Sequence, residues 1–199
     1  MTHRFLLFSS LAVAAALLPV RAQAQDAAPS GDEHALQLAL FAPLQVQSAE
    51  SSIAGLRLSL LYGRNASMVG LDLGLVTRTT GDATVLQSGL VNMIDGSFVG
   101  WQEGLVNRVE GPVRGLSQGL VNHAVSDLTG GQTGGVDIVS GRLEGVQAGI
   151  YNQAGTARGL QLGIVNYTRS AAGVLQIGLV NIISSKEHLP VLPIANWSH

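Results

Sequence analysis

The chain has 199 residues, of which 25 are glycine, and only 12% of its residues are charged while 46% are hydrophobic. The absence of cysteine excludes a disulfide scaffold, a thiolate zinc site and a cysteine nucleophile. The formal net charge of −2 gives no electrostatic basis for a nucleic-acid partner, and the low charge with high apolar content argues against an intrinsically disordered chain.

Residues 1–24 have the pattern of a secretory signal peptide. A basic start is followed by an apolar stretch that ends near Leu18, and Ala22-Gln23-Ala24 matches a signal-peptidase cleavage site. The apolar stretch is shorter than the ~20 residues that a transmembrane helix needs. We therefore expect an exported protein whose mature chain starts at Gln25 and which resides in the bacterial outer membrane, at the cell surface or in the periplasm.

Residues 25–50 form a lead-in to the ordered domain. Residues 25–32 are polar and contain alanine, proline and serine, whereas residues 36–47 are apolar enough to form a first strand or an N-terminal cap. No second long apolar run follows, so we expect no transmembrane helix.

Nine repeat units fill residues 55–188, and each has fifteen residues except one of fourteen. Their consensus opens Gly-Leu-Gln-x-Gly-Leu-Val-Asn, and residues 189–199 form a closing segment. We number the columns of the repeat from the first glycine of each unit. A fixed short period predicts stacked copies of one structural element. The units begin at residues 55, 70, 85, 100, 115, 130, 145, 159 and 174.

The even columns two, six, ten and fourteen are mainly apolar, which is the periodicity of a β-strand with one buried face. We therefore expect columns two and six to supply the buried anchors of the core. Column twelve is glycine in most units, which predicts a tight turn with positive φ. Column two is Leu56, Leu71, Leu86, Trp101, Leu116, Gly131, Val146, Leu160 and Leu175, and column six is Leu60, Leu75, Leu90, Leu105, Leu120, Gly135, Ile150, Ile164 and Leu179.

Columns three and eight are dominated by amide side chains. An amide at one place in every stacked unit can donate to one neighbour and accept from the other, which forms a ladder. A row of ligand-binding amides is the alternative, but one ligand would not require the same residue in six units. The predicted structural ladders contain Asn92, Asn107, Asn122, Asn152, Asn166 and Asn181 in column eight, and Gln87, Gln102, Gln147, Gln161 and Gln176 in column three.

Fifteen residues can form one coil of a β-solenoid, or one strand and turn of an antiparallel arrangement. In an antiparallel barrel successive turns lie at opposite ends, so the pattern should repeat every ~30 residues. The pattern repeats every fifteen residues, so the predicted fold is an all-β solenoid with about nine rungs. The low charge, the glycine content and the signal segment keep an antiparallel β-meander or a small outer-membrane β-barrel as the alternative.

The units at 55–62 and 70–77, the Gly-Leu-Val-Asn series and the segment 189–197 resemble a bacterial family of surface-repeat proteins of unknown function. The resemblance covers the chain from about Leu40 onward, and in column three it includes an Arg, an Asp and then the glutamines. It implies an envelope or surface location and brings no catalytic residues. The unit 130–144 departs from the pattern, because Gly131, Gly135 and Asp137 replace leucine, leucine and asparagine.

Motifs for catalysis or metal binding are weak. No two of the five histidines stand at metal-ligand spacing, and no Gly-x-Ser-x-Gly elbow occurs. Asp95, Glu103 and Glu110 lie on neighbouring units and are best explained as solvated turn charges. The glycine-rich segment 130–137 lacks the neighbouring copies that would complete a calcium site.

We therefore predict a non-catalytic protein of the bacterial envelope or cell surface with a structural or interaction role, and not an enzyme. We expect no catalytic, cofactor-binding or metal-binding residues, no cofactor and no nucleic-acid partner. The sequence leaves the surface or envelope partner, an association with the outer membrane and the oligomeric state open. A small outer-membrane β-barrel protein is the alternative function.

Overall fold

The computed structural model describes residues 33–41 and 44–198. The predicted signal peptide, residues 1–24, lies outside the described residues. The described part contains strands and no helix. The strands are β1 (Glu33–Phe41), β2 (Leu44–Gln45), β3 (Ser52–Asn65), β4 (Ser67–Thr79), β5 (Ala83–Ser88), β6 (Val91–Ile94), β7 (Phe98–Val109), β8 (Val113–Ala124), β9 (Leu128–Ile183) and β10 (Val191–Ser198).

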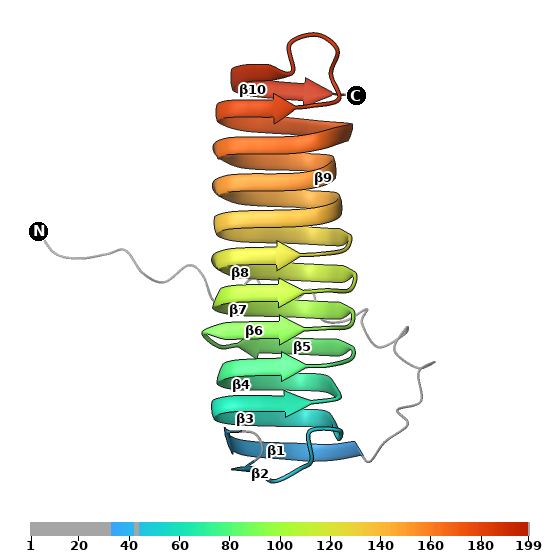
Figure 1. Ribbon diagram of the computed structural model, residues 1–199, viewed down its shortest axis with the longest axis vertical. Coiled ribbons are helices and arrows are strands. Elements are labelled where there is room, and N and C mark those ends of the chain that lie inside the picture. The colour runs from blue at the N-terminus through green and yellow to red at the C-terminus, as the bar shows by residue number, and fades with distance from the viewer. Residues whose placement is uncertain (1–32, 42–43, 199) are drawn as a thin grey trace, which may run out of the picture. The chain divides into compact units, whose positions relative to one another are not determined.

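The strands stack in parallel coils that climb in chain order from β1 to β9 (Figure 1). Residues fifteen apart are partners, so that Gly100 pairs with Gly115 and Gly115 pairs with Gly130. This parallel register confirms the prediction of an all-β solenoid. The alternative of an antiparallel meander or barrel is wrong, because each unit lies on the preceding one in the same direction.

Antiparallel strands close both ends of the stack. β10 pairs antiparallel with the last turn of β9, and the short β2 pairs antiparallel with β1. A parallel stack exposes unpaired backbone groups at its terminal coils, where a further chain could add. β10 covers the last coil along residues 174–182, whereas β2 covers only the end of β1, at Ala39 and Phe41.

Columns ten and fourteen form the apolar core, as the sequence predicts. Phe98 and Leu128 in column fourteen are fully buried, and Ile94 and Val139 in column ten are at most 1% exposed. These side chains form one continuous cluster along the stack.

Columns two and six are exposed, and the prediction that they anchor the core is wrong. Leu120 in column six is 61% exposed, and Leu116 in column two is 55% exposed. Side chains alternate along a strand, yet both column three and column eight point inward. The inward-pointing side chains are therefore in odd columns at column three and in even columns from column eight onward. For this reason the even columns do not share one face across the whole unit.

Seven of the eight described glycines with positive φ stand in the first column, and none stands in the twelfth. Gly100 has φ +139° and Gly115 has φ +148°, whereas the column-twelve glycines are absent from the positive-φ residues of the described chain. A Cβ on Gly111 would lie 2.5 Å from the carbonyl oxygen of Gly96 in the coil below. Column twelve is therefore glycine because the coils approach closely there, and the prediction of positive φ is wrong.

Candidate functional site

The asparagines of column eight lie in the interior and donate to one another along the stack. Asn92 Nδ2 donates to Asn107 Oδ1 at 2.8 Å, and Asn107 Nδ2 donates to Asn122 Oδ1 at 2.8 Å. The later units repeat the arrangement from Asn152 through Asn166 to Asn181, at 2.7 and 2.8 Å. Every donor points toward the C-terminal end of the stack.

The asparagine ladder is interrupted at Asp137. Asn122 Nδ2 donates to Asp137 Oδ1 at 2.7 Å, but Asp137 Oδ2 and Asn152 Oδ1 have no hydrogen-bond partner although both are buried. Both of these atoms lie within 3.1 Å of the place that a Cβ on Gly149 would occupy. Asp137 Oδ2 and Asn152 Oδ1 are therefore two buried acceptors beside Gly149 that no hydrogen-bond donor satisfies.

Burial raises the pKa of the Asp137 carboxyl to about 6, and the hydrogen bond from Asn122 opposes this shift. A protonated carboxyl could donate from Oδ2 to the unpartnered oxygen of Asn152, which an ionised one cannot. Protonation would therefore join the two parts of the ladder.

The glutamines of column three form a second ladder with the opposite direction. Gln102 Nε2 donates to Gln87 Oε1 at 2.8 Å, toward the N-terminal end. The same direction holds from Gln176 through Gln161 to Gln147, at 2.7 and 2.8 Å. Because one ladder donates upward and the other downward, their side-chain dipoles oppose each other.

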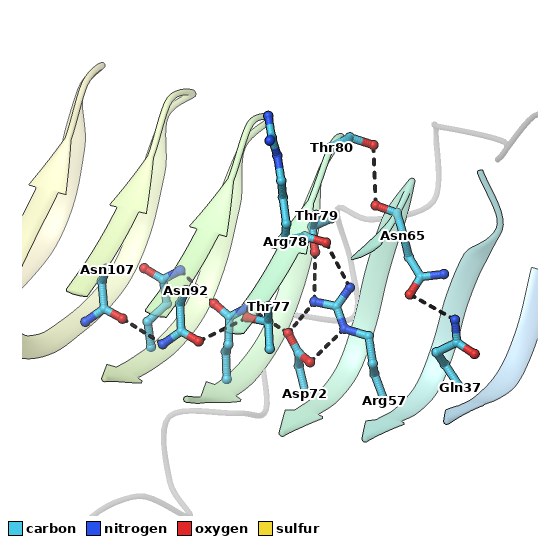
Figure 2. Close-up of polar contacts among 12 residues, drawn as sticks. Gln37, Arg57, Asn65, Asp72, Thr77, Arg78, Thr79, Thr80, Asn92 and Asn107 are labelled. Carbon is cyan, nitrogen blue, oxygen red and sulfur yellow. Dashed lines mark hydrogen bonds and ion pairs between the residues drawn. The ribbon is translucent and has the colours of Figure 1, made fainter. Parts of the chain in front are cut away.

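The glutamine ladder ends on a buried ion pair (Figure 2). Gln87 Nε2 donates to Asp72 Oδ2 at 2.7 Å, and Arg57 Nε donates to Asp72 Oδ1 at 2.7 Å. The same guanidinium donates to the carbonyl oxygen of Arg78 and to the hydroxyl of Thr79. Both charged side chains are 0% exposed, so the pair and its hydrogen bonds satisfy charges that water does not reach.

The eleven predicted ladder residues are all interior, and each is at most 3% exposed. The structure joins them into ladders within each column, and Thr77 links the two columns. Gln87 Nε2 donates to Thr77 Oγ1, and Thr77 Oγ1 donates to Asn92 Oδ1. Since they are buried and bonded to one another, they offer no row of amides to a ligand outside the solenoid. Their arrangement stabilises the stack of coils.

Replacing Asn122 with leucine should lower the free energy of unfolding by about 1–3 kcal/mol. The substitution removes the acceptor of Asn107 and the donor to Asp137, so buried polar atoms lose their partners. Denaturant unfolding followed by circular dichroism measures the change. Arg114→Leu, on an exposed position of the same strand outside the leucine face, is the control and should leave the stability nearly unchanged; equal stability of the two variants would contradict the ladder.

The outer surface carries a leucine face, which we define as the exposed side chains of columns two, four and six with their equivalents on β1. Columns four and six flank a shallow groove whose floor is the small residue of column five. Twenty leucine, isoleucine and valine side chains of this face are at least 36% exposed. They are Leu36, Leu38, Leu40, Leu58, Leu60, Leu71, Leu73, Leu75, Leu86, Leu90, Leu105, Leu116, Leu120, Val146, Ile150, Leu162, Ile164, Leu175, Ile177 and Leu179.

The middle of the leucine face is polar. Column four carries Glu103, Gln118 and Thr133 in three consecutive units, and these line a hollow above the column-five glycines. The apolar groove on the first coils is lined instead by leucines, including Leu58 and Leu73. The face is thus apolar toward both ends of the stack and polar at its centre.

His123 lies outside the core, between two polar neighbours. Its Nδ1 is 3.1 Å from Arg108 Nη1, and its Nε2 is 3.1 Å from Ser140 Oγ. Burial, and then the charge of Arg108, lowers the pKa of His123. Because arginine only donates, Nδ1 accepts and the neutral ring carries its proton on Nε2. Among the described residues, no three histidine, aspartate or glutamate side chains lie close enough together to hold a metal ion.

Two features of the surface and interior are not apparent from residue patterns alone. Asp137 stands out in the sequence as a substituted asparagine, but its effect on Asn152 depends on the direction in which the amides donate. The exposure of the leucine face depends on where the strand alternation changes phase. A signal for this change is the spacing of the amide columns, since columns three and eight differ by an odd number.

Comparisons with protein-family models, curated proteins and solved structures show no significant match to this chain. Within the described residues, no helix is long and apolar enough to cross a membrane.

Proposed function

We propose that this chain is a non-catalytic repeat scaffold of the bacterial envelope or cell surface, which uses its leucine face to bind a partner. The observation that carries the proposal is the size of this face. Burying a leucine-sized side chain removes ~60–120 Å² from water, so twenty half-exposed ones present on the order of 1,000 Å². The largest apolar patch of a typical monomer is about 300–600 Å².

The interior supports a scaffolding role. Two amide ladders, a buried ion pair and an apolar core link each coil to the next, as between Asn107 and Asn122. The amides of columns three and eight and the Arg57–Asp72 pair are buried and hydrogen-bonded within the stack. The exposed surface is left to determine which partner binds.

The N-terminal sequence supports export. Residues 1–24 combine a basic start, a short apolar stretch and a small-residue cleavage site, which together are typical of a secretory signal peptide. A large apolar face would promote aggregation in the absence of a partner. An exported scaffold that meets its partner in the envelope reconciles both features.

Expression of the full chain with a C-terminal epitope tag in a bacterium tests the proposal. We expect a cleaved chain that starts at Gln25 in the envelope fraction, measured by mass spectrometry after cell fractionation. Ala24→Arg is the control, because a large charged residue at the cleavage site should block processing. An unprocessed chain that remains in the cytoplasm would overturn the proposal.

A further inference from the structure

In column four of the leucine face, the order of residue types is almost symmetric about Gln118. On either side of this glutamine come a polar residue, a small residue and two large apolar residues. A surface with this order is complementary to a reversed copy of itself. The column reads Leu58, Leu73, Ser88, Glu103, Gln118, Thr133, Ala148, Leu162 and Ile177.

Columns two and six are complementary about the same point. The unit before Gln118 carries Trp101 and Leu105, whereas the unit after it carries Gly131 and Gly135 at the same two columns. Large side chains therefore project on one side of the centre. At an equal distance on the other side, the two glycines carry no side chain, and the ends of Leu116 and Leu120 lie close over them.

We propose that two copies of this chain pack through their leucine faces in antiparallel orientation, about a two-fold axis that runs along the strand direction at Gln118. This axis keeps each column opposite itself and reverses the order of the units. Trp101 of one copy then lies opposite Gly131 of the other, where no side chain projects, and Leu105 lies opposite Gly135. The apolar first coils of one copy cover the apolar last coils of the other.

The charge on the face selects the antiparallel orientation. In a parallel pair Glu103 would face its own copy, which places two carboxylates together in an interface, and the glycine unit would leave a void. In the antiparallel pair Glu103 faces Thr133, whose hydroxyl can donate to the carboxylate. Gln118 faces the same amide of the second copy, and two amides can donate to each other.

The area suits a stable dimer. A standard specific interface buries about 800 Å² per partner, and the leucine face presents on the order of 1,000 Å². Tryptophan is enriched among the residues that dominate interface affinity, and Trp101 lies near the centre of the face. A lipid surface fits less well, because Glu103, Gln118 and Thr133 would be moved from water into an apolar phase.

Crosslinking tests the orientation, because the chain has no cysteine and each introduced thiol is unique. Packed sheets lie about 10 Å apart, so a thiol-reactive linker of that length should join two copies of Gln118→Cys. Ser88→Cys should not crosslink, because its two copies would be offset by four coils, or ~19 Å. The double variant Ser88→Cys/Ala148→Cys should crosslink, since these positions face each other.

Three results, from crosslinking, light scattering and vesicle binding, would overturn the proposal. Crosslinking of Ser88→Cys alone as strongly as Gln118→Cys would show a parallel pair. A full chain that stays monomeric in light scattering at high concentration would show no dimer. Binding of the monomer to phospholipid vesicles, without dimerisation, would assign the face to a membrane.

An exchange of the large and small residues tests the register. Gly131→Trp should place a second large side chain opposite Trp101 and weaken dimerisation at least about tenfold, which is the usual effect of losing a central contact. A Cβ at Gly131 would lie 3.1 Å from the flexible end of Leu116 and 3.3 Å from the carbonyl oxygen of Val146, so the fold should accept it once the Leu116 side chain moves aside. Adding Trp101→Gly exchanges the two residues, so that a tryptophan again faces a glycine, and should restore dimerisation. A natively folded double variant that stays monomeric would contradict the register.

The inference rests on the proposed use of the leucine face, but the two can fail separately. A processed monomer in the envelope would overturn the dimer and leave the proposed function standing. An unprocessed cytoplasmic chain would overturn the proposed function whatever its oligomeric state.

Discussion

Arg57→Ala should lower the free energy of unfolding by about 3–5 kcal/mol, since removing one partner of a buried ion pair leaves an uncompensated buried charge. The Asp72 carboxylate would keep only the hydrogen bond from Gln87. The carbonyl oxygen of Arg78 and the hydroxyl of Thr79 would also lose a donor. The effect should be large because the pair anchors the end of the glutamine ladder.

Urea unfolding followed by circular dichroism measures this effect, and Arg142→Ala is its matched control. Arg142 pairs with Glu144 at 3.9 Å on the surface, so its loss should change the stability by less than ~1 kcal/mol. The double variant Arg57→Met/Asp72→Leu should recover most of the lost stability, because it removes both charges. Equal losses for Arg57→Ala and Arg142→Ala would refute a stabilising role for the buried pair.

Asp137→Asn should stabilise the protein by about 1–3 kcal/mol above pH 7, because it completes the asparagine ladder. The new amide can accept from Asn122 through its oxygen and donate to Asn152 through its nitrogen. It also removes a carboxylate that is ionised in a buried site. The substitution restores the residue that the other units carry in this column.

The same substitution should remove a pH dependence of stability. Because the pKa of Asp137 is raised to about 6 in the folded state, the folded protein binds this proton more tightly than the unfolded chain. The contribution of Asp137 to stability is therefore greatest at low pH, falls by up to ~3 kcal/mol as the pH rises between about 4 and 6, and stays at the lower value above.

The difference in stability between wild type and Asp137→Asn should be measured at about pH 5, midway through that window, and at about pH 8, above it, which isolates the contribution of Asp137. His123 contributes with the opposite sign, since its lowered pKa favours the folded state as the pH rises, but it contributes equally to both proteins. Glu144→Gln removes an exposed charge of the same sign and should keep the wild-type pH profile. An identical pH profile in wild type and Asp137→Asn would contradict the assignment to Asp137.

The sequence was sufficient to predict the solenoid because a period of fifteen residues follows from the way in which the coils stack. Units that repeat every fifteen residues with the same residues, as at Asn107 and Asn122, require equivalent surroundings, and parallel stacking provides them. The glycines of columns one and five indicate close approach of neighbouring coils, and a Cβ on Gly104 would indeed lie 2.5 Å from the oxygen of Gly89.

The placement of the leucines could not be predicted in the same way. Leucines are usually interior and amides usually exterior, so Leu120 appeared to be a better core residue than Asn122. The ladder reverses this preference, because an amide such as Asn107 or Asn122 both accepts and donates within the stack and loses little on burial. Once amides occupy the interior, the leucines remain outside and require a partner surface.

The exchange of side-chain amide protons with solvent, followed by NMR, tests most directly whether the amides form interior ladders. The NH₂ protons of Asn92, Asn107, Asn166 and Gln161 should exchange as slowly as the backbone amides of the central strands, because they are buried and bonded. Exchange at the rate of a solvated primary amide in the native protein would show that these side chains face water, and would contradict the solenoid interior described above.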